Sequence, residues 1–72
     1  MEKKSEELLA KATGFFVLAF RGRGIWDRRD SGSLDQALLD AKELYTNRPI
    51  GIYVKLPDDH GEHLSNWEPE RQ

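Results

Sequence analysis

The sequence predicts a small α+β domain in which a mainly antiparallel sheet is packed against one helix. Three features indicate this: a short apolar run between glycines, a helical stripe of leucines and alanines, and a later segment in which apolar residues alternate with others. Their order is strand, strand, helix, strand, after a short N-terminal helix. With 72 residues, the chain has room for a single domain, 1–72, and one modest core.

The N-terminal helix is predicted over residues 1–13. Glu, Lys, Leu and Ala dominate this stretch, and all four favour helices. Gly14 follows at a position where helices commonly end. We expect this short helix to form only when it docks on the rest of the domain.

The strongest strand signal runs from Phe15 to Phe20, where every residue is apolar. A strand that is apolar at every position is typically covered on both faces, so it should lie at the centre of the sheet. Gly22 and Gly24 then allow a tight turn. Residues 25–30 return as a polar second strand, which suits a sheet edge.

Ser33 begins the main helix as an N-cap, and Gln36 completes a capping box. The helix carries one apolar stripe, which we expect to face the sheet. The stripe consists of Leu34, Ala37, Leu38, Ala41, Leu44 and Tyr45. Leu39 lies off the stripe, so we expect it to be exposed.

The third strand, residues 50–56, shows the alternation of a half-buried strand. Tyr53 and Lys55 should point away from the helix. The residues expected to face the helix are Ile50, Ile52, Val54 and Leu56. After a turn, residues 62–67 could form a short fourth strand. The β-β-α-β core is therefore residues 15–67 with strand order 2-1-3, and residues 68–72 should form a frayed tail.

One face of the central strand would meet the main helix, and the other face needs a different cover. The candidates are the N-terminal helix, a second copy of the chain, or a partner. This uncovered face is the main functional clue in the sequence.

Composition argues against several functional classes. The net charge is -2, there is no cysteine, and no apolar run approaches the roughly 20 residues that span a bilayer. A cytoplasmic protein that contacts no membrane is therefore expected. No carboxylate or serine has the surroundings of a catalytic group, so we expect neither an enzyme nor a cofactor.

His60 and His63 are candidate metal ligands. Both could face one ion if this segment were helical. Gly61 between them and Pro57 before them favour a turn instead, so no metal site is predicted.

The candidate partner-binding residues are large or basic side chains that one core face cannot hold. Trp26, Tyr53 and Leu39 are candidates because, together with Trp67, they exceed the needs of a single small core, and Lys55 lies beside Tyr53. The alternative is that the aromatic residues pack under the N-terminal helix.

The first hairpin supplies a second set of candidates. Its arginines, which lie around Trp26, are Arg21, Arg23, Arg28 and Arg29. Arginine and an aromatic residue on a sheet could bind single-stranded nucleic acid. Asp27 and Asp30 in the same strand oppose this, and fit an edge strand kept soluble by mixed charge.

The segment Ser33–Tyr45, followed by Ile52–Lys55, is similar in layout to the family of small bacteriophage proteins that inhibit host RNA polymerase. Other small phage proteins, including CRISPR inhibitors, look alike in the same way. The resemblance covers roughly residues 15–56. It implies that basic residues of the third strand bind the target, and the matching positions here are Tyr53 and Lys55.

The sequence therefore predicts a non-enzymatic protein-binding module, a phage-encoded inhibitor or modulator of a larger host protein such as RNA polymerase, acting in the host cytoplasm. The alternative is a nucleic-acid-binding domain that uses the arginine-rich hairpin. The protein is expected to be a monomer or a homodimer.

Overall fold

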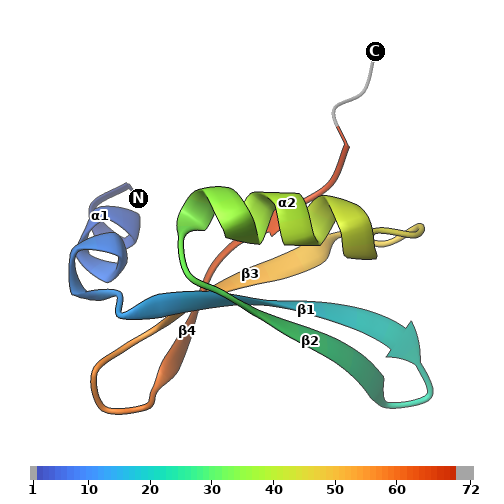
Figure 1. Ribbon diagram of the computed structural model, residues 1–72, viewed down its shortest axis with the longest axis horizontal. Helices are drawn as coiled ribbons and strands as arrows, with labels where there is room; N and C mark the ends of the chain where they lie inside the picture. The colour runs from blue at the N-terminus through green and yellow to red at the C-terminus, as the bar shows by residue number, and fades with distance from the viewer. Residues whose placement is uncertain (1, 70–72) are drawn as a thin grey trace.

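The computed structural model describes the backbone of residues 2–69 and the side chains of residues 6–69. Residue 1 of the predicted N-terminal helix and residues 70–72 of the predicted tail lie outside this part. The elements are α1 (Glu2–Lys11), β1 (Gly14–Gly22), β2 (Ile25–Ser31), α2 (Leu34–Leu44), β3 (Ile50–Lys55) and β4 (Gly61–Trp67) (Figure 1). The predicted α+β class is confirmed.

The four strands form one antiparallel sheet with the order β2-β1-β3-β4. β1 is a central strand, as its continuous apolar run predicts. The optional fourth strand is present over seven residues and pairs with β3. β3 is therefore an inner strand, and not the edge strand that a three-stranded 2-1-3 sheet would make it.

The β1–β2 turn has the left-handed backbone that its glycines allow. Gly22, Arg23 and Gly24 have φ angles of 94°, 56° and 76°. Glycine adopts such angles without steric cost, which explains two of the three positions. The tight turn folds β2 directly back along β1.

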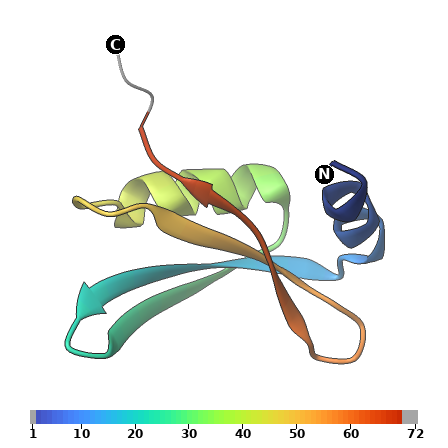
Figure 2. The ribbon, with the colours of Figure 1, turned by 180° about the vertical axis from the view of Figure 1, so that it is seen from behind.

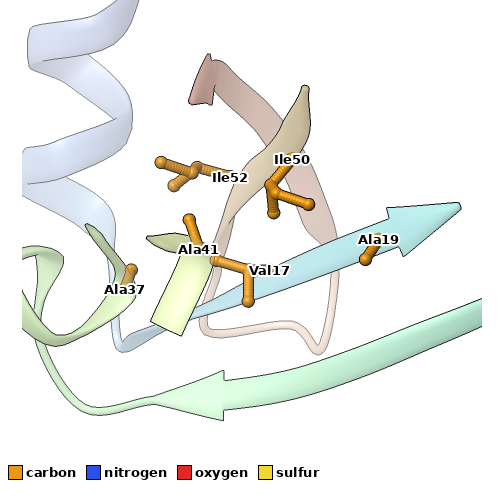
Figure 3. Packing of buried hydrophobic residues seen from close by; sticks show 6 residues of the cluster. All are labelled: Val17, Ala19, Ala37, Ala41, Ile50 and Ile52. Carbon is orange, nitrogen blue, oxygen red and sulfur yellow. The ribbon is translucent and has the colours of Figure 1, made fainter. Parts of the chain in front are cut away.

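α2 begins as predicted, with Ser33 as its N-cap. The backbone N–H of Gln36 donates a 3.1 Å hydrogen bond to the Ser33 hydroxyl oxygen. On the sheet side of the helix, Ala37 and Ala41 are fully buried. Their small side chains let α2 lie close to the sheet, against a cluster that comprises Val17, Ala19, Ile50 and Ile52 (Figure 3).

The predicted phase of the α2 stripe is wrong at Leu38, whose side chain is 38% exposed. Asp40 lies toward the sheet instead and is only 4% exposed. Its carboxylate accepts hydrogen bonds of 2.6 Å from the Ser31 hydroxyl and 3.1 Å from the Gln36 side chain. These partners compensate for its burial. A stripe defined by apolar residues alone could not include an aspartate.

The two helices lie on the same side of the sheet (Figure 1, Figure 2). α1 contacts β4, and its Leu8 is buried. The option that the N-terminal helix covers the other face, with Trp26 and Tyr53 beneath it, is therefore wrong. Within residues 2–69 no helix covers that face, which we call the open face. None of the helices in this range has the length and apolar character needed to cross a bilayer.

Candidate functional site

Strand register places the side chains of the open face. Directly opposed residues of an antiparallel sheet point to the same side. Val17 and Ala19 face α2, so their neighbours in β1 must face away from it. The larger residues that this places on the open face are Phe16, Leu18 and Phe20 of β1, Trp26, Arg28 and Asp30 of β2, Tyr53 and Lys55 of β3, and His63 of β4.

At the centre of the open face, one side chain from each strand joins a continuous row. The Arg28 guanidinium carbon lies 4.1 Å from the centroid of the Phe16 ring. The Phe16 and Tyr53 rings are stacked, with centroids 5.1 Å apart and planes at 9°. The His63 ring meets Tyr53 nearly at a right angle, at 5.2 Å. We call Arg28, Phe16, Tyr53 and His63 the cross-strand row.

The cross-strand row is held in place by its own contacts. Phe16 is 8% exposed although no helix covers it, because Arg28 and Tyr53 lie against its ring. The glycine at position 61 also allows this arrangement. A Cβ atom there would lie 2.9 Å from Cζ of Phe16, too close for an undisturbed ring.

A second aromatic group lies toward the β1–β2 turn. The Phe20 and Trp26 rings are 4.8 Å apart, and Arg48, from the segment between α2 and β3, approaches Phe20 at 5.1 Å. Trp26 remains 55% exposed and is the large apolar side chain most available on this face.

Cations slightly outnumber carboxylates on the open face. Asp30 contacts both Arg28, with a distance of 3.0 Å from Nε to Oδ1, and Lys55, with 3.5 Å from Nζ to Oδ2. The hydrogen bond from Arg28 is the main reason that the pKa of Asp30 lies below its ordinary value. With Arg48 and with Asp59 of the β3–β4 turn, the charged side chains placed on this face are three cations and two carboxylates. The whole chain carries -2.

A cavity of about 230 Å³ opens beside the cross-strand row, between β1, the end of β3 and the β3–β4 turn. Phe16 and Leu56 supply apolar walls, and Arg28 and Lys55 supply cationic ones. Asp59 and His60 of the turn also line it.

Of the residues proposed from the sequence, the structure brings four together. Tyr53, Lys55, Trp26 and Arg28 all lie on the open face. Leu39 does not lie with them, because it belongs to α2, on the other side of the sheet, where it is 56% exposed.

The arginine cluster of the first hairpin is divided between the two faces. Arg21 bonds Asp27 at 2.7 Å, and Arg29 bonds Glu43 of α2 at 2.6 Å. The hydrogen bonds from Arg29 to Glu43 and Asp40 raise the pKa of the guanidinium. Arg23 lies in the turn itself. Only Arg28 of the four is therefore placed on the open face by its strand register.

Sequence reasoning missed four residues that form aromatic or cation–π contacts on this surface: Phe16, Phe20, His63 and Arg48. Phe16 and Phe20 fell within a run assumed to be covered on both faces. The available signal was the alternation of side chains along a strand, which places Phe16 and Phe20 on the face opposite to Val17 and Ala19.

The two histidines have separate partners. Nε2 of His60 lies 2.6 Å from a Glu62 oxygen, and Nε2 of His63 lies 2.9 Å from the Asn66 side-chain oxygen. In the part of the chain that the structure describes, no group of three or more His, Cys, Asp or Glu residues is arranged to hold a metal ion.

Comparisons with protein-family models, with characterised proteins and with solved structures found no match to this chain. Arguments about function therefore depend on the open face itself.

Proposed function

We propose that this protein is a non-enzymatic binding module whose open face receives a larger protein. The observation that carries the proposal is the cross-strand row, an ordered set of aromatic and cationic side chains on a face that no helix of residues 2–69 covers. Tyr, Trp and Arg are the residue types that dominate binding energy in protein interfaces.

The stacked arrangement favours binding because it is already ordered. Immobilising a free side chain at an interface costs about 0.5–1.5 kcal/mol. Phe16 already holds Tyr53 and Arg28 in the unbound protein. Immobilising these two side chains on binding should therefore cost less free energy. Trp26 adds an exposed aromatic anchor toward one end of the same face.

A protein partner fits this face better than a single-stranded nucleic acid. Bases stack on ring faces that are open, whereas Arg28 and Tyr53 already lie against Phe16. Two of the hairpin arginines, Arg21 and Arg29, are paired with carboxylates on the helix side. The hairpin therefore offers less free positive charge than its sequence indicates.

The resemblance to phage inhibitors of host RNA polymerase supplies a first target to test. The positions that match the target-binding strand of that family are Tyr53 and Lys55, and both belong to the open face. We propose a bacterial host protein, with RNA polymerase as the first candidate.

Trp26 and Leu39 provide a matched pair of variants, because both are large, apolar and about equally exposed, on opposite sides of the sheet. The immobilised protein is used to capture partners from a bacterial lysate, and purified RNA polymerase is tested in parallel. We expect Trp26→Ala to lose the captured protein and Leu39→Ala to retain it.

The reverse result would assign the interface to α2. Binding of labelled single strands at physiological salt, abolished when all four hairpin arginines become Gln, would favour the nucleic-acid alternative. A stable dimer that Trp26→Ala dissociates would mean that a second copy covers the open face.

A further inference from the structure

We infer that the cavity between Arg28 and Lys55 receives an acidic side chain, Glu or Asp, presented by the partner protein. The inference rests on the proposed function, because it assumes that a protein docks on the open face. It adds the chemistry of one contact: a carboxylate between two cations, beside an aromatic ring.

The size of the cavity suits a single side chain. Its volume of about 230 Å³ lies below the roughly 300–1,000 Å³ of pockets that bury drug-sized ligands. Phe16 and Leu56 can pack against the methylene groups of a glutamate. A carboxylate at the end of that side chain would lie in the part bounded by Arg28 and Lys55.

The cations of the cavity already hold a carboxylate, that of Asp30. Asp30 engages Arg28 through Nε, at 3.0 Å, and Lys55 through Nζ, at 3.5 Å. A guanidinium has five N–H donors, so this contact uses only part of the capacity of Arg28. Among the described residues, Arg28 and Lys55 pair with Asp30 and neither forms an ion pair with Asp59, the other carboxylate at the cavity. Unused N–H donors therefore remain on both cations for a carboxylate from a partner.

The surrounding charges favour a protein carboxylate over a phosphate. The open face carries three cations and two carboxylates, a net charge of +1 within a chain of net charge -2, so it is complementary to an acidic protein surface. Asp59 also lines the cavity. Its negative charge opposes a doubly charged phosphate more strongly than a singly charged carboxylate.

Titration of the ¹⁵N-labelled protein with two blocked peptides tests the inference. The probe is acetyl-Ala-Leu-Glu-Leu-Ala-amide, and the matched control replaces Glu by Gln. We expect the Glu peptide to give saturable shifts at Arg28 Nε–H and at the Thr13 and Gly61 amides, which border the cavity. The Gln peptide should bind about tenfold more weakly, as expected when a hydrogen-bonded charge is lost.

Variants connect these shifts to the two cations. Arg28→Gln with Lys55→Gln should reduce binding of the Glu peptide about tenfold, whereas Arg23→Gln, in the β1–β2 turn, should leave it unchanged. Equal binding of the Glu and Gln peptides, or no saturable shift with either, would overturn the inference. Tighter binding of an eight-residue oligothymidylate with the same shifts would also overturn it, in favour of nucleic acid.

The captured partner separates failure of this inference from failure of the proposed function. If Trp26→Ala loses the partner while Arg28→Gln with Lys55→Gln keeps full affinity, the cavity inference is wrong and the binding face stands. If Trp26→Ala keeps the partner, the open face is not the interface and both proposals fail. If Trp26→Ala and Arg28→Gln with Lys55→Gln both lose affinity for the partner while Leu39→Ala keeps it, the binding face and the cavity inference are both supported.

Discussion

The ring of Phe16 in β1 lies parallel to the ring of Tyr53 in β3, and the two residues are direct partners in the sheet. This pair is the middle of the cross-strand row. Both residues belong to inner strands, so the row is anchored where the sheet is most completely hydrogen bonded. The contacts of Phe16 therefore determine the shape of the surface that a partner would meet.

Gly61→Ala should disturb this pair. The new Cβ would meet Phe16 Cζ at 2.9 Å and Cε1 at 3.1 Å, and Arg28 and Tyr53 hinder the ring from moving away. We expect a loss of about 1–3 kcal/mol in the free energy of unfolding, measured by urea denaturation.

Two further variants test whether the clash with Phe16 causes this loss of stability. Gly32→Ala is the control, since a Cβ there meets nothing within 4 Å and should cost little. In a Phe16→Leu background the loss from Gly61→Ala should shrink, because the clashing atoms are absent. An undiminished loss in that background would contradict the proposed clash.

Truncating a core side chain should cost more stability than truncating a partly exposed side chain of α2. Ile52 is fully buried in the cluster between α2 and the sheet, so Ile52→Ala should cost about 2–5 kcal/mol. Leu38 is partly exposed, and Leu38→Ala should cost about 1 kcal/mol or less. Urea denaturation measures both, and equal losses would show that Leu38 contributes to the core after all.

Most elements could be predicted from the sequence because their signals are local. The N-cap at Ser33, the alternation after Ile50 and the glycines of the first turn each act within a few residues. The predicted capping box is only half formed, because the Gln36 side chain donates to Asp40 and does not accept from the Ser33 backbone N–H. The position of α1 is not a local property, since it depends on which face of the sheet Leu8 reaches. The four-strand order likewise depends on β4 returning beside β3.

The candidate site was only partly predictable, for a similar reason. Arg28 and Arg29 are adjacent in one strand and so must point to opposite faces, a consequence of strand geometry that grouping the arginines by sequence overlooked. The buried Asp40 was hidden because its partner Ser31 is contributed by another element. The two-residue period divides the large side chains of β1 between two faces, but which face α2 covers is a property of the whole fold.

Asp40 should make stability fall in acid. The hydrogen bond from Ser31 is the main reason that the pKa of this carboxyl lies below its ordinary value. The folded state therefore binds the proton less tightly than the unfolded chain, whose aspartate pKa is about 3.9. The contribution of Asp40 is full well above that pH, declines as the pH falls through it, and is lost below the folded-state pKa.

Thermal melts between pH 7 and pH 2 can measure this effect. Asp40→Asn should be less stable than the wild type at neutral pH and should lose less stability on acidification. Asp35→Asn, an exposed change in the same helix, is the control and should follow the wild-type curve. An Asp40→Asn curve parallel to the wild type would contradict the assignment.

Zinc should not stabilise the β3–β4 hairpin. His60 is paired with Glu62 and His63 with Asn66, so the two imidazoles are engaged with different groups. A ligand that binds only the folded state must raise the melting temperature. We expect no change on adding zinc or EDTA, and a zinc-dependent rise abolished by His60→Ala with His63→Ala would prove this wrong.

Replacing Tyr53 and Lys55 of β3 tests the proposed interface directly. Tyr53→Ala with Lys55→Glu removes the middle ring of the cross-strand row and reverses a charge beside the cavity. Tyr53 is only partly buried and lies outside the helix-facing cluster, so the variant should stay folded. Loss of the aromatic pair should cost about 0.5–1.5 kcal/mol, with a further contribution from the area the ring buries.

Affinity for the captured partner should fall by about 2 kcal/mol or more, the scale of an interface hot spot. The matched control is Leu39→Ala with Lys42→Glu, which makes the same kinds of change at exposed positions of α2 and should bind normally. Circular dichroism and a binding titration on the same samples separate loss of fold from loss of contact. A folded Tyr53→Ala, Lys55→Glu variant with undiminished affinity would exclude the centre of the open face as the interface, because a partner seated there must touch the ring that this variant lacks.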